Sequence, residues 1–184
     1  MTTREQWIAG ARPKTLPAAI APVLVGTAFA GYNATVLHTL LALIVALALQ
    51  VGVNYANDYS DGIKGTDAHR IGPMRLVGSG TATAKDVKKA AFISFAIAAI
   101  AGLILASRTS WLLIILGAIC ILAAWTYTGG PKPYGYQALG EVSVFIFFGS
   151  LQRLEPITYK LNLSPEKFYS LLSRWAPWLA QSWF

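Results

Sequence analysis

The residues best suited to chemistry follow a long apolar run. Asn54, Asp58 and Asp61 come after the segment Leu37 to Val53. Carboxylates next to a membrane-length hydrophobic segment are costly, so their presence requires a reason. The spacing i, i+4 and i+7 places the three side chains on one face if a helix continues through them. Such oxygens can hold Mg²⁺ against a diphosphate. Alternatively, Asn54 and Asn57 end the span and the aspartates are solvated loop residues.

A glycine-rich basic segment follows these acids. Lys64, Arg70 and Arg75 offer donors to phosphate oxygens, and an arginine can bind phosphate through two parallel hydrogen bonds. A basic loop alone is weak evidence, because cytoplasmic loops of membrane proteins are commonly basic. Beside three oxygen ligands, however, it predicts a binding site for a diphosphate leaving group. Asp67 either joins the acids or neutralises a neighbouring base.

A second polar cluster follows the fourth apolar run and contains Tyr127 and Lys132. Lys132 can bind phosphate, and a tyrosine ring face can stabilise a carbocation. An interfacial aromatic belt with one anchoring lysine explains the same residues equally well. His38 and His69 have no partner in the sequence at metal-ligand spacing, so neither is assigned a role.

Composition predicts the setting of these residues. The chain of 184 residues is 55% hydrophobic and 12% charged, with a mean hydropathy of +0.50, whereas a soluble domain carries about 25% charged residues. The fold class is therefore all-α, a polytopic bundle of four to five transmembrane helices. The predicted spans are Leu16 to Tyr32, Leu37 to Val53, Val87 to Ala106, Ser110 to Thr128 and, marginally, Gln137 to Leu151, which carries Glu141.

The distribution of charge predicts orientation. Basic residues concentrate in the N-terminal segment and in residues 54–86 and their edge, whereas the two short turns between spans carry a single arginine, Arg108. By the positive-inside rule, the N-terminus and the 54–86 loop lie in the cytoplasm, and the chain lies in the plasma membrane. The scattered basic residues do not form a stripe with stacking aromatics, so we expect no nucleic-acid partner.

Three motifs together carry a resemblance to a known family. They span Ala11 to Pro17, Asn54 to Gly62 and Gly72 to Gly80, in that order. They resemble the intramembrane aromatic prenyltransferases, and most closely the 1,4-dihydroxy-2-naphthoate polyprenyltransferases of menaquinone synthesis. The resemblance covers about residues 4–149.

The resemblance implies a bundle of nine membrane helices around a central cavity. It also implies Mg²⁺-assisted ionisation of a polyprenyl diphosphate. The allylic cation is then captured by the ring of 1,4-dihydroxy-2-naphthoate with loss of its carboxylate, on the way to demethylmenaquinone. Residue by residue, it implies Asn54, Asp58 and Asp61 as ligands of Mg²⁺ and diphosphate, Arg75 and Lys64 as further diphosphate ligands, and a polar loop carrying Lys132 and Tyr127. Asp58, Asp61, Lys132 and Tyr127 are the expected catalytic residues.

The second half of the chain departs from this pattern. The last aspartate is Asp86, and the later acids Glu141, Glu155 and Glu166 form no cluster. We therefore expect residues 1–151 to form the N-terminal part of a prenyltransferase-type domain and 152–184 a divergent non-membrane tail, as a frameshift or early stop would leave. We expect such a shortened chain to be weakly active or inactive. The alternative is a non-catalytic small membrane protein or remnant half-bundle.

Overall fold

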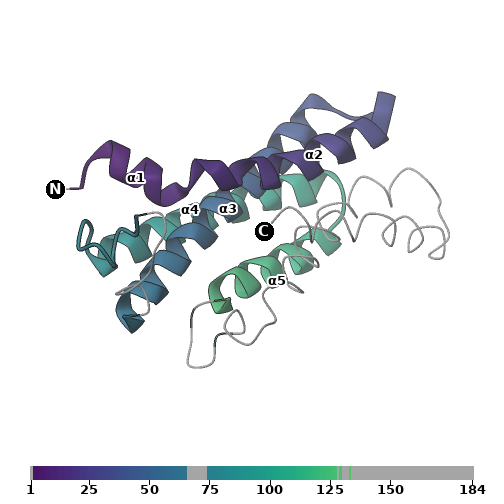
Figure 1. Cartoon of the computed structure of the whole chain (residues 1–184). Helices are drawn as coiled ribbons and strands as arrows, with labels where there is room; N and C mark the ends of the chain where they lie inside the picture. The colour runs from purple at the N-terminus through teal and green to yellow at the C-terminus, as the bar shows by residue number, and fades with distance from the viewer. Residues whose placement is uncertain (1, 66–73, 128, 130–132, 134–184) are drawn as a thin grey trace.

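The computed structural model describes residues 2–65, 74–127, 129 and 133, and the regular structure in these ranges is helical. The elements are α1 (Arg4–Ala11), the 3₁₀ turn η1 (Pro13–Thr15), α2 (Leu16–Ala30), the 3₁₀ turn η2 (Gly31–Asn33), α3 (Val36–Lys64), α4 (Ala84–Arg108) and α5 (Leu112–Thr126). In this bundle α3 is central, because α1, α2, α4 and α5 all contact it (Figure 1). The predicted all-α class is confirmed.

Three stretches of the described chain are long and apolar enough, by length and composition, to cross a membrane. They are Arg4–Ala30, which contains α1, η1 and α2, and the helices Val36–Lys64 and Ala84–Arg108. The fourth predicted span corresponds to α5, which has 15 residues and is shorter than the about 20 needed to cross a bilayer upright. The fifth predicted span lies outside the described residues.

Helix α3 extends well beyond the predicted end of its span at Val53. It has 29 residues, which at about 1.5 Å per residue gives a rod about 44 Å long, against a hydrocarbon core of about 30 Å. The helix ends where Gly65 adopts a left-handed conformation with φ of 69°, which glycine does without steric cost. The apolar run is therefore only the first part of a helix whose last turns are polar.

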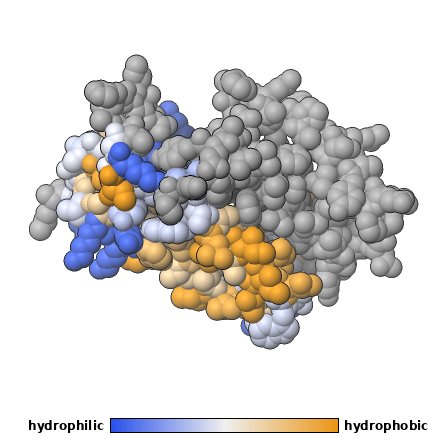
Figure 2. Space-filling view, turned by 90° about the horizontal axis from the view of Figure 1, so that it is seen from below, coloured by the Kyte–Doolittle hydropathy of each residue, from blue (hydrophilic) through white to orange (hydrophobic). Residues whose placement is uncertain are grey.

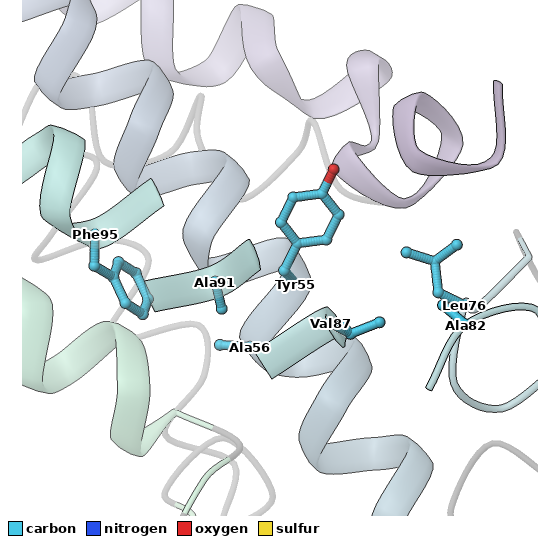
Figure 3. Close-up of a cluster of buried hydrophobic side chains, with 7 residues drawn as sticks. All are labelled: Tyr55, Ala56, Leu76, Ala82, Val87, Ala91 and Phe95. Carbon is cyan, nitrogen blue, oxygen red and sulfur yellow. The ribbon is translucent and has the colours of Figure 1, made fainter. Parts of the chain in front are cut away.

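The N-terminal segment is fastened to α3 near that polar end. Thr3 caps α1 in a reciprocal capping box with Gln6, and the Tyr55 hydroxyl donates to the carbonyl of Trp7 at 2.9 Å. The rings of Trp7 and Tyr55 meet edge to face with centroids 5.6 Å apart. Figure 3 shows the Tyr55 hydroxyl directed toward the ribbon of the N-terminal segment.

The core of the molecule lies between α3, α4 and the segment that precedes α4. Its buried side chains are Tyr55, Ala56, Leu76, Ala82, Val87, Ala91 and Phe95 (Figure 3). Several of them are alanines, and small residues let two helix backbones approach closely in a membrane protein. Gly52 of α3 packs against Phe95 of α4 so tightly that an added Cβ would lie 2.5 Å from the Phe95 ring. This packing holds the polar end of α3 against the segment that carries Arg75.

Glycine substitutions provide a test of this packing. We expect Gly52→Ala to lower the free energy of unfolding by about 1–3 kcal/mol, because the Phe95 ring must shift in a filled core. Gly102→Ala on α4 is the matched control, since its Cβ would meet Val45 at an ordinary 3.8 Å and the gain in helix propensity is up to about 1 kcal/mol. Denaturant titration in detergent measures both; equal effects of the two substitutions would contradict the packing described.

Apolar side chains cover much of the outer surface. Exposed leucines, isoleucines, valines and phenylalanines follow α2, α3, α4 and α5. Figure 2 shows a hydrophobic area on one face of the molecule, with many hydrophilic side chains gathered toward the end where the N-terminus lies in Figure 1. Exposed apolar area on this scale is normal for a surface that contacts lipid and unusual for a soluble monomer.

Candidate functional site

The predicted face of α3 exists, and its polar side chains are buried. Asn54, Asp58 and Asp61 lie within one continuous helix, and their exposed fractions are 3%, 1% and 5%. They are therefore not solvated residues beyond the end of a span, which was the competing interpretation. Buried carboxylates need hydrogen-bond or charge partners, and the structure shows where these partners come from.

The carboxylate of Asp58 binds two backbone amides of the segment before α4. Its Oδ2 accepts a hydrogen bond from the amide of Leu76 at 2.8 Å, and its Oδ1 accepts one from the amide of Val77 at 3.0 Å. A carboxylate that accepts two backbone amides acts as a charged clamp on the turn it binds. The Val77 side chain also packs directly on Gly62, where an added Cβ would collide with it.

The same segment places the guanidinium of Arg75 beside Asp61, the next acidic residue along α3. Arg75 Nη2 lies 3.1 Å from Asp61 Oδ2, and both side chains are more than nine-tenths buried. Because Arg75 immediately precedes the two amides that Asp58 binds, the clamp determines where the guanidinium lies. The predicted diphosphate ligand Arg75 is thus brought onto the acidic face, whereas Lys64 is an exposed residue at the last position of α3.

Asn54 faces the N-terminal segment through its nitrogen. Its Nδ2 donates to the carbonyl of Ala11 at 2.9 Å and to Oγ1 of Thr15 at 3.1 Å. Gln50, one turn earlier on α3, donates to the same Thr15 hydroxyl at 3.2 Å. Neither Gln50 nor Thr15 was predicted as a site residue. The sequence did contain a signal for Gln50, because it is a polar amide inside an apolar span and lies one helical turn from Asn54.

The second predicted cluster is only partly described. Tyr127 follows the last turn of α5 and is half-buried. Two residues earlier, the Trp125 ring stacks on Tyr59 with centroids 6.1 Å apart, so this end of α5 lies beside the polar end of α3. Lys132, Asp67 and Arg70 lie outside the described residues.

The donor groups on α3 have the chemistry that Mg²⁺ prefers. The described residues contain no group of three or more His, Cys, Asp or Glu side chains able to hold a metal, so the face supplies two carboxylates and one amide oxygen. Mg²⁺ is commonly held by one or two carboxylates, with substrate phosphates and water completing its shell. Each oxygen of Asp58 accepts one amide and retains a second lone pair. The residues therefore fit a metal that arrives with a diphosphate.

Comparison with known proteins agrees with the motifs. The model of the UbiA prenyltransferase family matches residues 19–152. A 1,4-dihydroxy-2-naphthoate octaprenyltransferase of Mycobacterium tuberculosis is 58% identical over 151 residues, which is 81% of this chain and 52% of that protein. An octaprenyltransferase of the same name from Escherichia coli is 44% identical over 156 residues, 80% of this chain and 51% of that protein.

A 2-carboxy-1,4-naphthoquinone phytyltransferase of Synechocystis is 29% identical over 157 residues, 81% of this chain and 49% of that protein. The chain thus spans about half the length of the curated relatives it matches. No solved structure matched it.

The family match contains α3, α4 and α5 together with the Arg75 segment. Its extent, well over half of the chain, confirms the resemblance that the three motifs indicated. With its long apolar helices, the molecule is a multi-pass membrane protein. It is a member of the UbiA prenyltransferase family.

Proposed function

We propose that this chain takes part in the transfer of a polyprenyl group from a polyprenyl diphosphate to 1,4-dihydroxy-2-naphthoate. The ring loses its carboxylate as CO₂ and diphosphate leaves, which gives the hydroquinone form of demethylmenaquinone. The observation that carries the proposal is the buried face of α3, where Asp58 and Asp61 lie beside Arg75. Acidic and cationic groups side by side suit a metal-bound diphosphate. The names of the relatives support the choice of acceptor.

The proposed roles follow from the chemistry of each group. Asn54, Asp58 and Asp61 would hold Mg²⁺, which when bound neutralises charge on the departing diphosphate. Arg75 and Lys64 donate hydrogen bonds to the phosphate oxygens. The apolar helices exclude water from the allylic cation, which water would otherwise capture. We assign Tyr127 to the cation through its ring face and Lys132 to the diphosphate.

The proposal includes the setting of the site. We place the chain in the plasma membrane. The charge distribution favours an orientation in which the N-terminus and residues 54–86 lie on the cytoplasmic side. We also retain the division into a prenyltransferase-type domain of residues 1–151 and a divergent tail of 152–184.

A second candidate is a non-catalytic membrane protein that binds a metal-bound diphosphate without turnover. The observation that favours it is that both acidic groups have structural partners: Asp58 accepts hydrogen bonds from two backbone amides, and Asp61 forms an ion pair with Arg75. Such a site can bind without the further groups that catalysis requires.

One assay separates the two candidates. Membranes containing the chain are supplied with a radiolabelled polyprenyl diphosphate, Mg²⁺ and 1,4-dihydroxy-2-naphthoate. We expect a low yield of lipid-soluble product that falls by at least about 100-fold in Asp58→Ala. Asp86→Ala is the control, because Asp86 is an exposed residue in the first turn of α4 that bonds only Thr83 among the contacts described. Product no higher than with an empty vector contradicts catalysis and favours the second candidate.

A further inference from the structure

The hydroxyl of Thr15 connects the N-terminal segment to the polar face of α3. It donates to the carbonyl of Arg12 at 2.9 Å and accepts from Nε2 of Gln50 at 3.2 Å and Nδ2 of Asn54 at 3.1 Å. A hydroxyl has one donor hydrogen and two acceptor lone pairs. All three are used here, so the group has little freedom to rotate.

The backbone of the N-terminal segment is bent to place this hydroxyl. Arg12 adopts a left-handed conformation with φ of 54°, and it is the only described residue other than glycine with positive φ. This strained residue ends α1, and Pro13 then starts the 3₁₀ turn that carries Thr15. Backbone strain of this kind persists where the surrounding structure requires it, and it is concentrated at functional sites.

The consequence is a defined orientation for the Asn54 carboxamide. Both hydrogens of Nδ2 are taken, one by Ala11 and one by Thr15. The amide is planar, so its Oδ1 is turned away from the N-terminal segment. No donor among the described contacts binds that oxygen, although the residue is only 3% exposed. A hard cation binds an amide through oxygen and not through nitrogen.

We propose that Thr15 is a positioning residue of the metal–diphosphate site, which holds the Asn54 carboxamide so that oxygen faces the cation. The inference rests on the proposed function. It also explains why the Ala11 to Pro17 motif accompanies the acidic motif although it contributes no metal ligand. Without the Thr15 hydroxyl, the carboxamide keeps one acceptor, Ala11, and gains freedom to turn its nitrogen toward the site.

The chain supplies a matched control for a purely structural effect. At the other end of α2, the Thr27 hydroxyl lies 3.2 Å from the Thr39 hydroxyl of α3 and donates to the carbonyl of Val23. Thr27→Val therefore removes a hydrogen bond between α2 and α3 without touching Asn54. Thr15→Val and Thr15→Ser complete the set, since serine keeps the hydroxyl that valine lacks.

The experiment measures Mn²⁺ binding to the full chain in detergent by electron paramagnetic resonance, with inorganic diphosphate present. We expect Thr15→Val to weaken Mn²⁺ binding by about 10- to 100-fold, the usual effect of removing a group that orients a metal ligand. Thr15→Ser restores binding and Thr27→Val leaves it unchanged. In an Asn54→Ala background, Thr15→Val has no further effect, because the residue through which it acts is gone.

Two different results would overturn the proposal. The positioning role is rejected if Thr15→Val binds Mn²⁺ with wild-type affinity, or if Thr15→Val and Thr27→Val lose equal Mn²⁺ affinity. Either result leaves the proposed metal site in place. Absence of Mn²⁺ binding by the wild-type chain in the presence of diphosphate rejects the proposed site itself, and the role of Thr15 with it.

Discussion

Replacing Asp58 by asparagine is expected to release the segment before α4 as well as to impair the site. The carboxylate accepts the amides of Leu76 and Val77. Asparagine has one acceptor oxygen, so its NH₂ group faces the second backbone donor and one buried amide loses its bond. The cost of such a loss is about 1–3 kcal/mol. Metal–diphosphate binding falls by about 100-fold, because a proposed metal ligand and the position of Arg75 are lost together.

Trypsin provides a direct readout of the released segment. Arg75 is 8% exposed in the folded protein, so cleavage after it requires local opening. A cost of 1–3 kcal/mol raises the open population by about 5- to 150-fold, measured by mass spectrometry as the peptide that begins at Leu76. Asp86→Asn, at an exposed helix cap, is the matched control and leaves both readouts at wild-type level. Unchanged cleavage in Asp58→Asn means that the carboxylate does not hold this segment.

Replacing Arg75 by methionine is expected to be the most destabilising change at the site. The substitution keeps an apolar side chain of similar length but removes the guanidinium that lies 3.1 Å from Asp61. Breaking a buried ion pair from one side costs about 3 kcal/mol or more, because the remaining charge stays buried. Denaturant titration of the metal-free protein in detergent, followed by circular dichroism, measures this loss. Diphosphate binding falls as well, since a bidentate donor is gone.

A double variant separates these two effects. Arg75→Met combined with Asp61→Asn removes both charges, so the free energy of unfolding recovers toward the wild-type value. Diphosphate binding does not recover, because the variant lacks both the cation and a metal ligand. If the double variant is as unstable as Arg75→Met alone, the ion pair does not account for the instability.

The helices were predictable because their signals are local. Long apolar runs indicate membrane helices whatever surrounds them, and the structure places α2, α3, α4 and α5 where the runs predicted them. Hydropathy placed the end of the second span at Val53, whereas α3 continues to Lys64, as the alignment of the three polar residues required. Hydropathy indicates where a helix leaves the lipid. It does not indicate that the helix continues through polar residues when the partners of those residues come from distant parts of the chain.

The alignment of Asn54, Asp58 and Asp61 was likewise determined by the sequence alone, since helical periodicity fixes which residues share a face. Their partners were not. Asn54 bonds Ala11 and Asp58 bonds Leu76 and Val77, and a hydrogen bond between residues so far apart in the chain depends on how two segments pack. Packing depends on the whole set of side chains, such as Phe95 against Gly52. Composition and periodicity thus specified the type and alignment of these three oxygen-bearing side chains. Only the tertiary structure decided that the same groups also anchor the N-terminal segment and position Arg75.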